Sequence, residues 1–222
     1  ILRAVHALLG AVLSEHPENA LRPQVSWSRE DGAHRVEVVT WDRAGLFGRM
    51  AGAFAVAGIN ILSCRAFSRE DHVVVDLFRV ALPEDAEGAL ARFSAAIEAT
   101  LVRGDDLRPQ VDAEDARRAR LLPRRRPSLA DRPVVRVYEA PELSRAVVEI
   151  QAPDRLGLLF RLGTAIRDAG YAITFANVAT ERGYALDTFY LVPEPSVRTK
   201  PAPLGALESS LGDVLAAAPA FP

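Results

Sequence analysis

The chain has 222 residues, of which 49% are hydrophobic and 25% charged, so it can bury one large core or two small ones. Its net charge of -2 gives no global field that would favour nucleic acid or an anionic membrane. The single cysteine, Cys64, excludes a disulfide within the chain and favours a cytoplasmic location. No signal peptide is recognisable and the longest apolar runs are shorter than a membrane span, so we expect no membrane partner.

The N-terminal part predicts a helix followed by a hairpin. Residues 1–20 carry apolar side chains at helical spacing and predict an N-terminal helix that serves as a tether. Because the sequence opens on helix-like residues and its only methionine is Met50, we expect a piece of a longer protein. Two extended runs, residues 22–28 and 35–40, flank an Asp-Gly turn and predict an antiparallel hairpin.

The main functional signal is a stretch that occurs twice, as WDRAGLFGRMAGAFAVAGINI at residues 41–61 and PDRLGLLFRLGTAIRDAGYAI at residues 153–173. In each copy an apolar extended run ends at an Asp-Arg pair, a glycine follows, and an amphipathic helix begins. Asp42 and Asp154 are predicted to cap these helices, and a glycine ends each of them. Each copy therefore reads as a strand, a turn and a helix that packs one face on a sheet.

A strand hairpin and a second helix follow each copy, which gives the order of a ferredoxin-like fold without its fourth strand. We expect the upstream strand to fill that slot, so that residues 24–28 pair with 36–40, and 134–138 with 147–151. The predicted fold class is α+β, with two ferredoxin-like βαββαβ-type modules that have antiparallel sheets and helices on one face. The predicted boundaries are a helix or tether at 1–20, modules at 21–102 and 132–222, and a charged linker at 103–131.

The linker contains the basic runs 116–120 and 124–126, which a nucleic-acid interface would also show. Acidic residues in the same stretch offset this charge, so a solvated linker with a short helix is the favoured interpretation. We therefore expect no nucleic-acid partner.

No catalytic or metal-binding pattern stands out. The chain lacks the nucleophile-elbow, P-loop and dinucleotide-binding patterns, and His6 and His16 have no partner at metal-ligand spacing. The fragment is therefore expected to have no catalytic residues, no metal and no cofactor. Binding fits better, because a glycine turn before a helix lets backbone N–H groups approach a carboxylate. Asn60 offers an amide to a polar ligand, and equally suits a turn after Gly58.

The motifs D-R-x-G-L and A-G-x-N-I in the first copy, and D-R-x-G-L-L with A-L-D-T-F-Y-L in the second, resemble ACT domains. Their tandem arrangement is similar to the C-terminal pair in bifunctional uridylyltransferase/uridylyl-removing enzymes. The resemblance implies a regulatory module that senses an amino acid, glutamine in that family. Carried over by position, the ligand-binding residues are Asp42, Arg43, Ala44, Gly45, Leu46, Asn60, Asp154, Arg155, Leu156, Gly157 and Leu158.

Because the second copy has Ala172 where the first has Asn60, we expect the amide-bearing ligand at the first copy's turn. The resemblance also implies a parent nucleotidyltransferase and phosphodiesterase that needs a divalent metal. Its implied partners are the upstream catalytic domains, the PII protein and a second copy in a homodimer. The competing hypothesis is a tandem module that serves only as a protein-protein or oligomerisation interface.

Overall fold

The computed structural model describes residues 22–30, 32–68, 72–120, 132–195 and 200–216. The predicted helix in residues 1–20 lies outside these ranges, as do the arginines at 124–126. The first module contains β1 (Gln24–Glu30), β2 (Ala33–Trp41), α2 (Leu46–Val56), β3 (Asn60–Ser68), β4 (Val73–Ala81) and α3 (Ala86–Glu98), continued by a π-helical turn (Ala99–Arg103). The second contains β5 (Val134–Ala140), a short 3-10 turn (Pro141–Leu143), β6 (Arg145–Pro153), α5 (Leu158–Asp168), β7 (Tyr171–Glu181), β8 (Tyr184–Pro193) and α6 (Leu204–Ala216).

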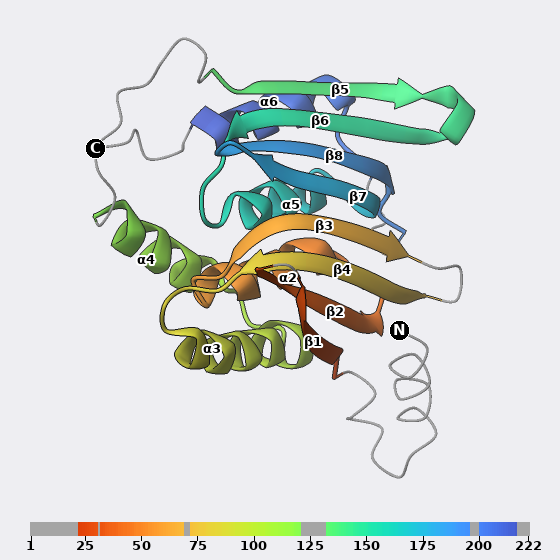
Figure 1. The fold of residues 1–222 in the computed structure, drawn as a ribbon. Coiled ribbons are helices and arrows are strands. Elements are labelled where there is room, and N and C mark those ends of the chain that lie inside the picture. The colour runs from red at the N-terminus through yellow and green to blue at the C-terminus, as the bar shows by residue number, and fades with distance from the viewer. Residues whose placement is uncertain (1–21, 31, 69–71, 121–131, 196–199, 217–222) are drawn as a thin grey trace.

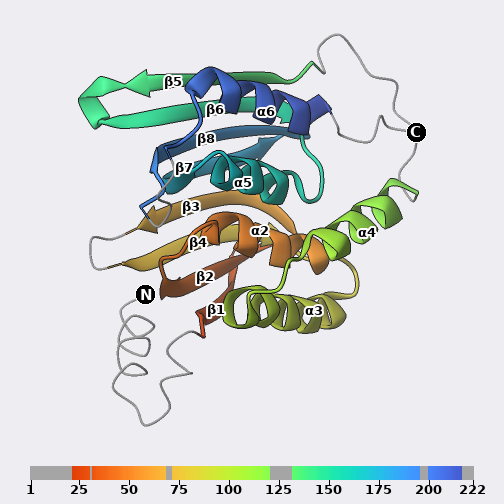
Figure 2. The ribbon, with the colours of Figure 1, turned by 180° about the vertical axis from the view of Figure 1, so that it is seen from behind.

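The eight strands found in the described ranges form one antiparallel sheet in the order β1-β2-β4-β3-β7-β8-β6-β5. The helices α2, α3, α5 and α6 cover one face of this sheet, and Figures 1 and 2 show it from its two sides. The predicted α+β fold with two ferredoxin-like modules is thus confirmed. Within the described residues, no helix is long and apolar enough to cross a membrane.

The upstream strands fill the fourth-strand position, as predicted. In the first module Gln24 pairs with Val39 and Ser28 with Arg35. In the second module β5 lies beside β6 in the same way, with Val134 opposite Gln151. A hairpin partner can take this edge because it needs only a tight turn, whereas a strand after the last helix would need a longer return connection.

The modules join through β3 and β7, whose central residues pair from Ser63–Ala179 to Phe67–Phe175. On the helix face, α2 and α5 pack against each other where the backbones of Gly48 and Gly163 touch. A Cβ atom on Gly163 would lie 2.8 Å from the Cα of Gly48, so these positions admit no larger side chain without a shift. This contact fixes the distance between the two glycine turns, which lie at opposite ends of the helix pair.

The predicted linker contains helix α4 (Arg108–Ala119), which confirms the short helix expected there. This helix is not solvated all round, because Leu107 and Val111 are buried against the helix layer. In Figure 2, α4 lies on the helix side of the molecule beside the end of α2.

Candidate functional site at the module junction

The two repeated turns have the same backbone geometry. Gly45 and Gly157 precede α2 and α5 with φ angles of 68° and 77°, a left-handed conformation that glycine adopts without steric cost. Each glycine is itself the N-cap residue, and neither helix has a side-chain cap. The first amide of each helix donates to a turn carbonyl, Leu46 to Arg43 at 3.1 Å and Leu158 to Arg155 at 3.2 Å. The next amides of the first turn have neither an acceptor within the helix nor a side-chain cap, and they suit an anionic group.

The prediction that Asp42 and Asp154 cap these helices is wrong. Each lies three residues ahead of its N-cap glycine, and the left-handed turn directs its carboxylate to the end of the neighbouring strand. The Asp42 carboxylate accepts hydrogen bonds from the Ser68 hydroxyl and the Arg43 amide. The Asp154 carboxylate accepts from Thr180 Oγ1 at 3.1 Å and from the Arg155 amide. The two aspartates instead tie each turn to the third strand of its own module.

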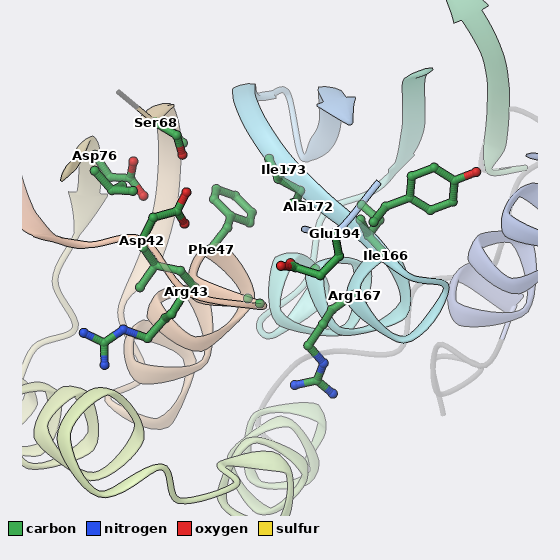
Figure 3. A pocket seen from close by; sticks show the side chains of 17 residues that line it. Asp42, Arg43, Phe47, Ser68, Asp76, Ile166, Arg167, Ala172, Ile173 and Glu194 are labelled. Carbon is green, nitrogen blue, oxygen red and sulfur yellow. The ribbon is translucent and has the colours of Figure 1, made fainter. Parts of the chain in front are cut away.

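The turn arginines point away from these carboxylates. Arg43 donates to the carbonyl oxygen of Leu101, and Arg155 donates to that of Val214 at 3.3 Å. Both acceptors lie at the end of the second helix of the same module, whose last carbonyls lack helical partners. Figure 3 shows the guanidinium of Arg43 directed away from the Asp42 carboxylate. The two arginines thus hold the second helix of each module to its turn.

The remaining predicted site residues are mostly packing residues. Leu46, Leu156 and Leu158 are buried in the core, while Ala44 is partly buried within its turn.

A pocket with a cavity volume of about 30 Å³ joins the first turn to the second module. Its walls include Asp42 and Gly45 from the first module and Ala172 and Glu194 from the second. In Figure 3 the carboxylates of Asp42 and Glu194 lie on opposite sides of the pocket. This volume holds a water molecule or two, so an amino acid would enter only as the walls move apart.

Burial and charge set the protonation of this pocket. Asp42 is exposed at the mouth, where the surrounding protein still raises its pKa through desolvation. Asp76 lies behind it with 1% of its surface exposed, and burial raises the pKa of this carboxyl to about 8. At neutral pH the pocket therefore has a neutral, protonated Asp76 behind the carboxyl group of Asp42.

The equivalent pocket at the second turn, of about 20 Å³, is lined by residues 154–160 together with Asn60 and Ile61 at the start of β3. Asn60 therefore faces the second turn and not the first, and its side chain hydrogen-bonds the Asp154 carboxylate. Our expectation that Asn60 serves the first copy's turn is wrong. The reason is the antiparallel pairing of β3 with β7, which places the start of each strand beside the helix start of the other module.

Several residues of these pockets carry no individual signal in the sequence analysis. Ser68, Arg167 and Glu194 approach the first turn only through the strand pairing and the helix packing. Asp76 and Asp187 do have a recognisable signal, since both copies place an aspartate inside an apolar strand at equivalent positions. Burial, then the charge of Asp154, raises the pKa of Asp187 to about 8, and the backbone amide of Ala179 opposes this rise. Within the described ranges no group of three or more His, Cys, Asp or Glu residues is arranged to hold a metal ion.

The chain is a tandem pair of ferredoxin-like modules on one sheet, each with a glycine turn between its first core strand and its helix, which is the arrangement expected from the resemblance to ACT domains. The sequence is similar to bifunctional uridylyltransferase/uridylyl-removing enzymes from several bacteria. It is 33% identical over 177 residues to that of Novosphingobium aromaticivorans, which covers 77% of this chain and 19% of the relative. The enzyme of Rhodospirillum rubrum is 31% identical over 166 residues, a match that covers 73% of this chain and 17% of the relative. The enzyme of Streptomyces coelicolor is 33% identical over 165 residues, which covers 68% of this chain and 18% of the relative.

The chain spans about a fifth of the length of the curated relatives it matches, and it fits a fragment of a bifunctional uridylyltransferase/uridylyl-removing enzyme. No protein-family model matches the sequence. Among solved structures, an aspartate kinase from Synechocystis aligns with 85% of this chain and 28% of its own, at 20% identity and a TM-score of 0.43.

Proposed function

We propose that this chain is the amino-acid-sensing regulatory part of a bifunctional uridylyltransferase/uridylyl-removing enzyme, and that its ligand is glutamine. One observation carries the proposal: the pocket at the first turn combines an uncapped helix start with carboxylates from both modules. The N-terminal amides of α2 complement a ligand carboxylate, assisted by the helix dipole. Asp42 and Glu194 complement an α-ammonium group. The helix amides and the two side-chain carboxylates together complement the α-carboxylate and the α-ammonium group that every free amino acid carries.

The placement of the pocket suggests how binding is transmitted. Because its walls come from both modules and its cavity holds no more than a water molecule or two, a ligand must separate or rotate the modules in order to enter. Such a movement reaches the rest of a longer chain through the ends of this one. In the parent protein it would shift the balance between uridylyl transfer to the PII protein and its removal, reactions that need a divalent metal outside this fragment. The parent's upstream domains would be the first to respond, in the cytoplasm.

Isothermal titration of the chain with glutamine, glutamate and other amino acids tests this function. Asp42→Asn removes one carboxylate charge from the pocket and keeps the shape of the side chain, so we expect glutamine affinity to fall about tenfold or more. Asp213→Asn, on the exposed side of α6, is the matched control and should bind like the wild type. The absence of binding heat with every amino acid would refute the proposal.

A second candidate function, self-association, is favoured by the face of the sheet that carries no helix. Directly paired residues form one apolar row across seven strands on this face: Val39, Val75, Phe67, Phe175, Tyr190, Val147 and Tyr138. At its centre the rings of Phe67, Phe175 and Tyr190 contact one another edge to face, and Phe67 is 39% exposed. Phe67 and Tyr138 are exposed in this row, Phe175 and Tyr190 are partly buried, and the three valines are buried. Exposed aromatic side chains gathered on one face are typical of protein contacts.

Sedimentation analysis tests this second candidate. A homodimer through the sheet faces predicts that the wild type sediments as a dimer and Phe67→Glu as a monomer, whereas Thr188→Glu on the neighbouring polar row changes little. A monomeric wild type would exclude the homodimer.

A further inference from the structure

The two glycine turns are equivalent in sequence and backbone but have different neighbours. At the first turn, the side chain nearest to a Cβ on Gly45 would be that of Arg167, with Cδ at 2.6 Å. The equivalent residue at the second turn is the much shorter Ala55, and its Cβ lies 4.0 Å from the corresponding position on Gly157. The space that remains is filled by Val111 of α4, whose Cγ1 lies 2.8 Å from that position. Val111 is fully buried there.

Ion pairs hold α4 over the second turn. The Oδ2 atom of Asp115 accepts from Arg155 at 3.3 Å and from Arg161 at 3.2 Å, and Arg161 also pairs with Asp112 at 2.7 Å. The side chains of Asp115 and Arg155 are only 12% and 11% exposed, so water screens their attraction weakly. Arg155 belongs to the repeated D-R-x-G-L motif, which means that α4 is fixed to the turn itself.

The rest of α4 contacts the first module. Arg118 donates to the carbonyl oxygen of Gly58 at 2.7 Å, two residues before Asn60. Burial raises the pKa of Asp154, and the charge of Arg118 is among the influences that oppose this rise. Leu107, immediately ahead of the helix, lies 3.5 Å from a Cβ position on Gly52 of α2. The helix thus connects the second turn to the end of α2 and closes the gap between the modules at this end of the junction.

The first turn is covered differently, by the single side chain of Arg167 from α5, and none of the atoms nearest to a Cβ on Gly45 belongs to α4. We propose that α4 is a latch that keeps the second turn's site closed, so that the chain binds one ligand molecule, at the first turn. This inference rests on the proposed amino-acid binding. It explains why a duplicated turn yields two unequal sites, and it assigns Asp115 as the residue that fastens the latch.

Matched substitutions at equivalent positions test which turn binds the ligand. Ala172→Phe fills the first pocket and Asn60→Phe fills the second; Ala172→Leu and Asn60→Leu are milder replacements if either phenylalanine variant fails to fold. In glutamine titrations we expect the wild type and the Asn60 variant to bind one equivalent, and the Ala172 variant to bind none. Two equivalents for the wild type, or loss of binding in the Asn60 variant alone, would overturn the inference.

The latch itself is tested by the double variant Val111→Ala/Asp115→Asn, which removes the contact with Gly157 and the charge that Arg155 and Arg161 hold. We expect this variant to bind two equivalents of glutamine. If it still binds one, at the first turn, α4 is not what closes the second site. If it binds at the second turn while the wild type binds nothing, the assignment of the ligand to the first turn is wrong.

Amide hydrogen exchange separates this inference from the proposed function, because it needs no ligand. If neither the wild type nor any variant binds an amino acid, the proposed function fails. The hydrogen-exchange rates of the α4 amides still test whether Asp115 holds this helix over the second turn. We expect Asp115→Asn to accelerate exchange of the α4 amides and of the turn at Gly157 by about tenfold or more, and to leave the centre of α5 unchanged. Unchanged protection of α4 would refute the latch.

Discussion

The side chain of Asn60 in the first module hydrogen-bonds the carboxylate of Asp154 in the second. This bond crosses the junction between the modules, and it lies at the end of the α2 and α5 pair where the chain turns into β3. Its counterpart at the other end is missing, since Ala172 occupies the equivalent position. The two ends of the junction are therefore held together by different interactions.

Asn60→Ala is expected to reduce the free energy of unfolding by about 1–2 kcal/mol at pH 7, because a partly buried carboxylate loses a donor. The loss should shrink in acid, where Asp154 is protonated and accepts hydrogen bonds less strongly. Denaturant unfolding at pH 7 and pH 4 measures both values. An equal loss at the two pH values would show that the amide stabilises the junction without its bond to Asp154.

The contact between Gly48 and Gly163 predicts a position that tolerates no side chain. Gly163→Ala places a Cβ 2.8 Å from the Gly48 Cα, so α2 and α5 must separate, at a cost of about 1–3 kcal/mol. The control is Gly212→Ala in the middle of α6, where no atom lies within 4 Å of the new Cβ. This control should stabilise the chain by up to about 1 kcal/mol, because alanine favours the helix more than glycine does. Thermal unfolding distinguishes the two, and equal effects would mean that the helices adjust freely.

The two turn arginines are expected to differ in importance although their motifs are the same. Arg155→Met leaves the buried Asp115 with Arg161 alone, and we expect it to cost about 2 kcal/mol or more, because a buried charge loses a partner. Arg43→Met removes only donors to uncharged acceptors and should cost about 1 kcal/mol. In a double-mutant cycle, Asp115→Asn should recover part of the loss caused by Arg155→Met. Full additivity of the two substitutions would contradict the proposed pairing.

Local patterns in the sequence were sufficient to predict the modules and the pairing of their upstream strands. The hairpins beside β2 and β6 depend on turns and on alternation of apolar residues, both of which are local properties. The sequence does not predict the joining of the two sheets through β3 and β7, because strand pairing over more than a hundred residues leaves no local signal. The same long-range pairing moves Asn60 to the second turn, which explains why the sequence led to the wrong partner for it.

The helix caps illustrate a different limit. An aspartate ahead of a helix is a good cap by propensity, and the sequence favours Asp42 and Asp154 for that role. The structure directs both carboxylates to strand ends, because the glycine at positive φ reverses the chain between the aspartate and the helix. Whether a glycine adopts this conformation depends on its neighbours, among them Arg167 and Val111, which come from distant segments.

The buried carboxyls of Asp76 and Asp187 predict an unusual dependence of stability on pH. Burial raises the pKa of each from 3.8 to about 8, so the folded chain holds these protons at pH values where the unfolded chain has released them. Between about pH 4 and pH 8 the folded state therefore binds more protons, and the free energy of unfolding falls as the pH rises. Each tenfold difference in proton affinity between the two states contributes about 1.4 kcal/mol.

The double variant Asp76→Asn/Asp187→Asn keeps the shape of both side chains and removes their titration. We expect the wild type to lose several kcal/mol more than this variant between pH 5 and pH 8, measured by denaturant unfolding at both pH values. The comparison of the two slopes cancels the groups that titrate equally in both proteins. Parallel slopes would mean that these carboxyls ionise at ordinary pH values, so that charged aspartates, and not neutral ones, lie behind Asp42 and Asp154 at neutral pH.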